Sequence, residues 1–224
     1  FRHQPAMMSS RTLLIGLLIL AVASLGLAIS VGSVPIGWRS LWMLPISGGT
    51  DLERTLILDV RLPRAAAAFA VGGLLALAGT LMQVLLRNPL ADPYVLGISG
   101  GAAVAALTAM LLGLSGMGLT AAAFGGALLT MAMVFTLARK GDSWNPTRLL
   151  LTGVVIASGW AALIGFILTV SPDTALKNML FWLMGDLSFA GNAFSALGVL
   201  AVGLALALFI ARDLPADHPD VVAG

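Results

Sequence analysis

Residues 61–102 read RLPRAAAAFAVGGLLALAGTLMQVLLRNPLADPYVLGISGGA, and this stretch decides the fold. Positions 65–86 within it contain no charged residue, and about 20 apolar residues are enough for a helix to cross the hydrocarbon core of a membrane. A short polar link containing Pro89 and Pro93 follows, and a second apolar run begins after it. The stretch therefore predicts one membrane span, a tight loop at the membrane surface and the start of another span.

The whole chain has the same character, with 59% hydrophobic and only 10% charged residues among 224, whereas a soluble domain has about 25% charged residues. The longest uncharged segment, 93–138, is too long for one span and is interrupted by GLSGMG at 113–118, where glycine permits a turn. Hydropathy thus predicts an all-α, multi-pass transmembrane bundle over residues 12–211, with polar tails at 1–11 and 212–224. The expected spans are about 12–34, 64–86, 94–113, 119–138, 149–170 and 190–211.

Several classes of function are excluded by composition. The net charge of +2, without a basic run, argues against a nucleic-acid partner. The absence of cysteine excludes disulfides, Cys-ligated zinc and iron–sulfur clusters, and the two histidines, His3 and His218, lie in opposite tails. We therefore expect no metal site and no cofactor.

An enzymatic function is also not expected. Positions 97–101, GISGG, match the G-x-S-x-G nucleophile pattern, but no histidine lies near them in the sequence. The chain has no Walker motif and so cannot itself be an ATPase. No ionisable residue lies inside a predicted span, which argues against an ion-coupled carrier and favours a pathway whose energy is supplied elsewhere.

Lys and Arg in the loops predict a cytoplasmic N-terminus. Arg2 and Arg11 precede the first span, and Arg139, Lys140 and Arg148 follow the fourth. The loop after the first span conflicts with this rule, since it also contains several arginines. A cleaved signal peptide is the alternative for the first span, because Ala21-Val22-Ala23 resembles a cleavage site.

Small residues predict close helix packing. Gly72 and Gly79 belong to a stripe of small residues on one face of the second span, and Gly97 and Gly101 have GxxxG spacing in the third. Common use of glycine and alanine in membrane helices is the alternative explanation for the GxxxG pair. Asp92 before Pro93 suits a helix start with an aspartate N-cap.

Arg61 and Arg64 flank Leu-Pro at the predicted outer end of the second span. Two explanations remain open for this pair. The side chains could anchor the helix at the interface by snorkelling, or they could form a basic patch for an acidic partner surface.

Four motifs together carry a resemblance to a known family. The chain resembles the FecCD family of ABC-importer permeases in these four stretches. They are RLPR with the following GG-LL-LAG and MQ, then RNPLADPYVLGISGGA, then LLTGVVIASG at 150–159, and FWLMGDL at 181–187. The resemblance covers about residues 12–212. It implies a type II ABC importer permease fold and import of ferric siderophores, cobalamin or haem, in that order of preference.

The resemblance also implies roles for individual residues. Arg61 and Arg64 match a basic pair that docks onto the periplasmic binding protein. Two loops match the cytoplasmic gate, and small residues of the fifth span match the pathway lining, while 178–188 match an outer segment near the pathway mouth. The gate residues are Asn88, Pro89, Leu90, Pro146 and Thr147, and the lining residues are Gly153, Ala157, Ser158 and Ala161.

The partners implied by the resemblance are two ABC ATPase subunits, a periplasmic substrate-binding protein, a second copy of the permease in a homodimer, and the lipid of a bacterial inner (plasma) membrane. Relatives have a second half that repeats spans two to five, preceded by a cytoplasmic helix with an LGxxxAxxLG-like pattern. The tail 212–224 has no such pattern, so the chain is expected to be the N-terminal, six-span part of a permease. A transport-inactive fragment or a membrane scaffold is the alternative.

Overall fold

The computed structural model describes residues 9–32, 51–139, 145–187 and 193–212, and every regular element within these ranges is a helix. The chain divides into two compact units, residues 75–186 and the remainder on either side of them, and each is considered by itself. The helices are α1 (Ser10–Ser30), α3 (Asp51–Thr55), the π-helix η1 (Leu56–Arg61), α4 (Leu62–Leu86), the 3-10 helix η2 (Pro93–Leu96), α5 (Ile98–Leu111), α6 (Gly116–Ala138), α7 (Pro146–Val170), α8 (Asp173–Met184) and α9 (Ala193–Arg212).

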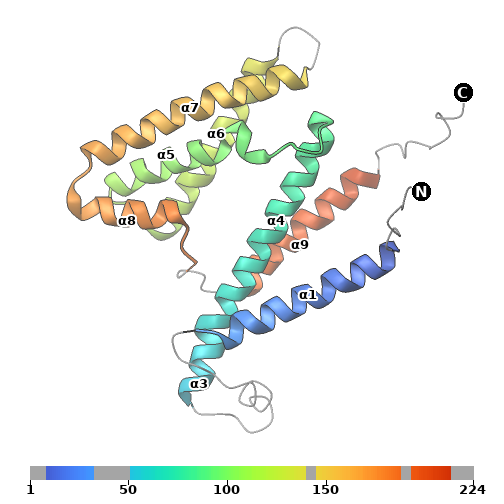
Figure 1. Cartoon of the computed structure of the whole chain (residues 1–224). Coiled ribbons are helices and arrows are strands. Elements are labelled where there is room, and N and C mark those ends of the chain that lie inside the picture. The colour runs from blue at the N-terminus through green and yellow to red at the C-terminus, as the bar shows by residue number, and fades with distance from the viewer. Residues whose placement is uncertain (1–8, 33–50, 140–144, 188–192, 213–224) are drawn as a thin grey trace, which may run out of the picture. The chain divides into compact units, whose positions relative to one another are not determined.

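The first unit contains α1, α3, η1, the beginning of α4, and α9. Helix α1 contacts η1 near the C-terminal end of α1, and α4 lies beside α9 at Gly73 (Figure 1). A Cβ atom at Gly73 would lie only 2.9 Å from Cδ1 of Leu200, so the missing side chain lets the two helices approach. Most large apolar side chains of α1 are exposed, as expected for a helix that faces lipid.

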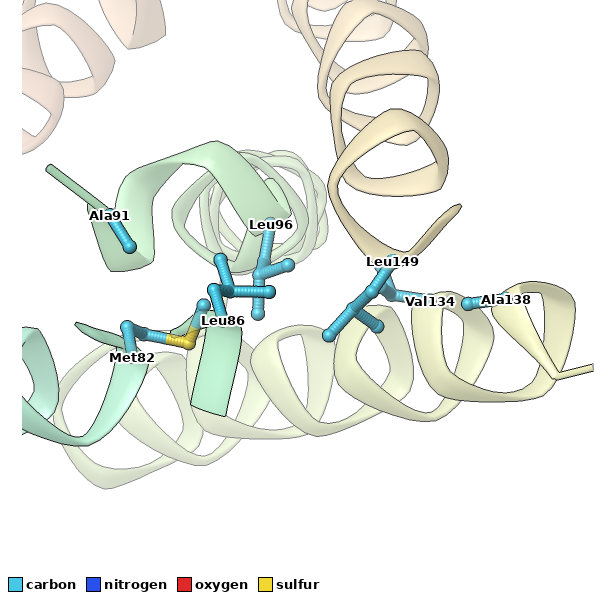
Figure 2. Close-up of a cluster of buried hydrophobic side chains, with 7 residues drawn as sticks. All are labelled: Met82, Leu86, Ala91, Leu96, Val134, Ala138 and Leu149. Atoms are coloured by element: carbon cyan, nitrogen blue, oxygen red, sulfur yellow. The ribbon is translucent and has the colours of Figure 1, made fainter. Parts of the chain in front are cut away.

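The second unit is built around α5, which packs on α6, α7 and α8 (Figure 1). At the α8 end, Met179 and Leu107 are fully buried and pack with Ile167. At the opposite end of α7, a second cluster of buried side chains joins the end of α4 to η2, α6 and the start of α7. We call this the junction cluster, and Figure 2 shows its members, Met82, Leu86, Ala91, Leu96, Val134, Ala138 and Leu149.

Helices α5 and α6 approach so closely that glycine is required on both. A Cβ atom at Gly101 would collide with the Thr130 hydroxyl oxygen, and one at Gly126 would collide with the carbonyl oxygen of Gly101. Thr130 is fully buried, and its hydroxyl donates to the carbonyl oxygen of Gly126 at 2.8 Å. In a membrane, where lipid gives no hydrophobic drive for helix association, such close backbone packing is a principal source of stability.

Four helical stretches in the described residues are long and apolar enough to span a membrane: 11–30, 52–86, 116–138 and 146–170. Two shorter apolar helices, 98–111 and 195–210, lie where the third and sixth spans are predicted, and the count of six spans and its boundaries remain a prediction. A break between helices is present near the predicted 113–118, but it covers 112–115, because α5 ends at Leu111 and α6 begins at Gly116. Gly113 there has φ +75°, a conformation that glycine adopts without strain.

Two local features differ from the sequence expectations. Asp92 is an N-cap as predicted, and its Oδ1 accepts from the Tyr94 N–H at 2.8 Å, but it caps the short helix η2 rather than the long span. Helix α8 was not predicted, because its mixture of Asp173, Lys177 and apolar residues suits neither a span nor a simple loop. Burial of Met179 explains why this segment is helical in the folded chain.

Candidate functional site

The loop after α4 begins with an unusual helix cap. Asn88 N–H donates to the carbonyl oxygen of Gln83 at 3.1 Å, and Arg87 N–H donates to that of Val84 at 3.2 Å. This is the Schellman pattern, in which the residue after the helix adopts the left-handed conformation. Arg87 occupies that position with φ +49°, although glycine is favoured there. Helix α5 ends in the same pattern with Gly113.

Because Arg87 holds a conformation that costs a non-glycine residue about 1 kcal/mol or more, we expect Arg87→Gly to raise the free energy of unfolding by about 1 kcal/mol. The measurement is thermal or denaturant unfolding of the purified protein in detergent. Asn88→Gly, at a neighbouring position without positive φ, is the matched control and should not stabilise. Equal stabilisation by both variants would contradict the assignment of strain to Arg87.

The rest of the loop is fixed by its own hydrogen bonds. The Asn88 side-chain oxygen accepts from Leu90 N–H at 2.9 Å, and the Asn88 carbonyl oxygen accepts from Ala91 N–H at 3.1 Å. Ala91 and Leu96 are buried in the junction cluster, so both ends of the loop are anchored. Leu90, by contrast, is 88% exposed. The geometry presents Leu90 at the tip of a rigid turn.

The second predicted gate loop precedes α7 and is fixed in a similar way. The Asn145 side-chain oxygen accepts from Thr147 N–H at 2.9 Å, and Pro146 occupies the first turn of the helix. Pro146 and Thr147 are exposed, while Leu149 is buried in the junction cluster. Since the same cluster anchors both loops, the structure brings the five predicted gate residues to one end of the second unit.

Helix α7 has a buried face and an open face, and the four predicted lining residues divide between them. Gly153 is buried, and a Cβ atom there would lie 2.7 Å from the carbonyl oxygen of Val95. Ala157 lies against Gly97, whose Cβ would be 3.0 Å from it. Gly153 and Ala157 therefore pack against η2 and the start of α5 and do not face open space. Their small size allows α7 to approach these backbones closely.

Ser158 and Ala161 lie on the open face of α7 and are exposed. Val154 and Gly165 share this face at steps of four, three and four residues, and a Cβ atom at Gly165 would meet nothing within 4 Å. The Ser158 hydroxyl donates to the carbonyl oxygen of Val154 at 2.9 Å. This bond satisfies the hydroxyl donor of Ser158. The open face therefore carries mostly small side chains and no unsatisfied hydroxyl donor at Ser158.

The two arginines predicted to dock a partner have different surroundings. Arg61 is half-buried, and its Nη1 donates to the carbonyl oxygens of Ile29 at 2.9 Å and Ser30 at 3.0 Å. These carbonyls belong to the last turn of α1, where helix geometry leaves them without backbone partners and negative potential accumulates. Arg64 is exposed. Arg61 thus caps α1, and Arg64 is the more accessible of the pair.

The four glycines predicted to pack helices also differ. Gly101 and Gly97 lie in tight contacts, and Gly97 in addition has φ +70°, which glycine tolerates best. A Cβ atom at Gly72 or Gly79 would meet nothing within 4 Å among the described residues, so packing at these two positions remains a prediction. Within the same residues, no three His, Asp or Glu side chains gather to hold a metal ion.

Comparison with known proteins decides the family. Residues 17–217 match the FecCD transport family. The chain belongs to the FecCD transport family. The vitamin B12 import system permease protein BtuC of Vibrio cholerae is 38% identical over 167 residues, which cover 73% of this chain and 50% of that protein. The hemin transport system permease protein HmuU of Yersinia pestis is 38% identical over 180 residues, covering 78% and 52%.

A third FecCD relative, the ferric enterobactin transport system permease protein FepD of Escherichia coli K12, is 39% identical over 176 residues, covering 77% of this chain and 52% of that protein. The chain therefore spans about half the length of the curated relatives it matches. A solved structure described as an inward-facing conformation of a metal-chelate type ABC transporter superposes with a TM-score of 0.74 at 26% identity, covering 90% of this chain and 62% of that one.

This membership confirms the resemblance inferred from the sequence, the transport class and the all-α permease fold. Sequence reasoning missed two features of this FecCD chain. The strained cap at Arg87 could have been suspected from a helix that ends without glycine. Trp160, whose indole N–H is the one buried side-chain donor without an acceptor in the described ranges, gave no signal in the sequence.

Proposed function

We propose that this chain forms part of the translocation pathway of an ATP-binding-cassette importer, as a membrane-spanning permease subunit for a bulky metal chelate. Ferric siderophores are the first candidate, followed by cobalamin and haem. The observation that carries the proposal is the family match over residues 17–217. The names of the relatives, which include B12, hemin and ferric enterobactin permeases, support this substrate class.

The pathway is proposed to run along the open face of α7. Small residues such as Ser158 and Ala161 leave room for a large substrate and bind it weakly, which suits a carrier that must release it again. The exposed loops around Leu90 and Thr147 would close one end of the pathway. Movement of these loops would follow ATP binding by partner subunits, since no charged residue within 65–86 or 149–170 could couple transport to ions.

The assembly proposed here includes two ABC ATPase subunits, a periplasmic substrate-binding protein and a second permease copy in a homodimer. The site would be the bacterial inner membrane, with the N-terminus in the cytoplasm. Exposed Arg64 is the better candidate for docking the binding protein, because Arg61 already binds the end of α1.

An uptake assay tests the proposal. The chain is expressed with the ATPase and binding-protein subunits of a FecCD-family importer in a strain that lacks its own permease, and accumulation of radiolabelled ferric siderophore and cobalamin is measured. We expect ATP-dependent uptake that is lost in Ser158→Trp and Ala161→Trp. Phe166→Trp is the matched control, since Phe166 is already large and is exposed elsewhere on α7. Uptake that is unaffected by all three variants would overturn the assignment of this face.

Arg61 and Arg64 make a matched pair for a further prediction. Arg61→Gln should lower the free energy of unfolding by about 1–2 kcal/mol, because two charge-assisted hydrogen bonds to the end of α1 are lost. Arg64→Gln should leave stability unchanged and weaken binding-protein affinity, with the larger defect at low salt. Unfolding in detergent and binding to immobilised permease give the two readings. Equal stabilities of the two variants would contradict the capping role of Arg61.

A further inference from the structure

Three arginines gather at the junction-cluster end of the second unit. Each directly adjoins in sequence a buried member of that cluster, and the three adjoining members come from α4, α6 and α7. The clustering of these members brings three helix ends to one end of the unit (Figure 2). The three arginines adjoin these members in sequence and therefore lie at the same end. The pairs are Leu86 with Arg87, Ala138 with Arg139, and Leu149 with Arg148.

These arginines have no acidic partner in the described part of the chain. Arg87 and Arg139 are exposed and Arg148 is half-buried. The nearest acid in sequence to Arg87 is Asp92, and one of its oxygens is already used to cap η2. Lys140 and Asp142 lie in 140–144, outside the described residues. Among the described residues, this end of the second unit thus carries three arginines and one carboxylate, that of Asp92.

The same end of the unit carries the side chains that mark a membrane–water boundary. Tyr94 is 73% exposed, and tyrosine is enriched at the headgroup level. Leu90 is exposed on the neighbouring turn. Helices α6 and α7 are each long and apolar enough to span the hydrocarbon core. In that arrangement Arg139 and Arg148, next to the helix ends, would lie near the lipid headgroups.

The backbone strain at Arg87 also supports a functional contact for its side chain. Glycine would remove the strain, as Gly113 does at the end of α5, and yet a guanidinium is present. A side chain that is held in an unfavourable backbone conformation is a candidate for a functional contact.

We propose that Arg87, Arg139 and Arg148 bind the phosphate of an anionic phospholipid at this end of the second unit. The planar guanidinium matches phosphate oxygens in pairs, and Tyr94 would contact the adjoining glycerol region. The site rests on insertion into a membrane and does not depend on which substrate is transported.

The test compares lipid binding by the purified full chain in detergent. Native mass spectrometry or thermal unfolding is measured during titration with dioleoyl-phosphatidylglycerol and, separately, dioleoyl-phosphatidylcholine. We expect preference for phosphatidylglycerol, reduced about fivefold by Arg139→Gln or Arg148→Gln alone and roughly 100-fold by the triple glutamine variant, since each basic residue near a membrane surface contributes similarly. Arg64→Gln, which lies outside this unit, is the control and should retain the preference.

Arg87→Gly separates lipid binding from folding. This variant should unfold at a higher temperature in phosphatidylcholine and still lose about fivefold of the phosphatidylglycerol preference. Equal binding of the two lipids by the unmodified chain, or an undiminished preference in the triple variant, would overturn the proposal. Inorganic phosphate that competes as well as the lipid would show a free-anion site and would also overturn it. If the unmodified chain preferred phosphatidylglycerol but gave no uptake in the transport assay, the proposed transport function would be contradicted and the lipid site would not.

Discussion

Gly126→Ala is expected to lower the free energy of unfolding by about 3 kcal/mol, at the upper end of the cost of overpacking a tight interface. The added methyl group would collide with the carbonyl oxygen of Gly101 and lie 2.6 Å from Cβ of Ala105. A backbone carbonyl cannot rotate away as a side chain can, so α5 and α6 must separate. Unfolding in detergent, followed by near-ultraviolet circular dichroism, measures the effect.

The preceding residue provides a control for this prediction. A Cβ atom at Gly125 would meet nothing within 4 Å, and alanine is favoured over glycine inside a helix by about 1 kcal/mol. Gly125→Ala should therefore be neutral or slightly stabilising. If the two alanine variants unfolded alike, the close approach of α5 and α6 would not be a feature of the folded protein.

The second large effect is expected at Gly153, where alanine should lower the free energy of unfolding by about 2 kcal/mol. Its methyl group would lie 2.7 Å from the carbonyl oxygen of Val95 and 2.9 Å from Cα of Leu96. Both are backbone atoms of η2, which is anchored in the junction cluster by Leu96. The methyl group would therefore displace α7 from η2 and disturb the loop that begins at Arg87.

Gly159→Ala is the control on the same helix, because a Cβ atom there has no neighbour within 4 Å. It should keep both stability and uptake. Gly153→Ala should reduce both, and thermal unfolding together with the uptake assay measures the two effects. A stable Gly153→Ala protein would show that α7 and η2 are not in the close contact described here.

The sequence predicted the helical segments well, because charge-free runs and glycine turns mark them directly. The break before Gly116 and the Asp92 cap were predictable for the same reason: turn and capping chemistry is local. Helix α8 was not, since its helical form follows from burial of Met179 against α5 and α7, which no local pattern reveals.

The sequence also could not predict which residues of α7 lie on its buried face and which on its open face. Gly153 and Ser158 are both small and both suited a lining role, and their spacing does not say which one packs against η2. Likewise, the two arginines of the RLPR motif were equivalent in the sequence. In the structure the end of α1 lies beside Arg61, so the Arg61 guanidinium donates to two carbonyl oxygens of that helix. Such assignments depend on neighbours that are distant along the chain.

The division of α7 into two faces has a consequence for how such a permease can change. If the pathway runs along the open face as proposed, substitutions at Ser158 or Ala161 would alter the surface presented to a substrate and leave the contacts of Gly153 with η2 untouched. On that proposal, preference for one cargo over another would diverge between related chains by changes on a single helix, without any change in the architecture of the bundle.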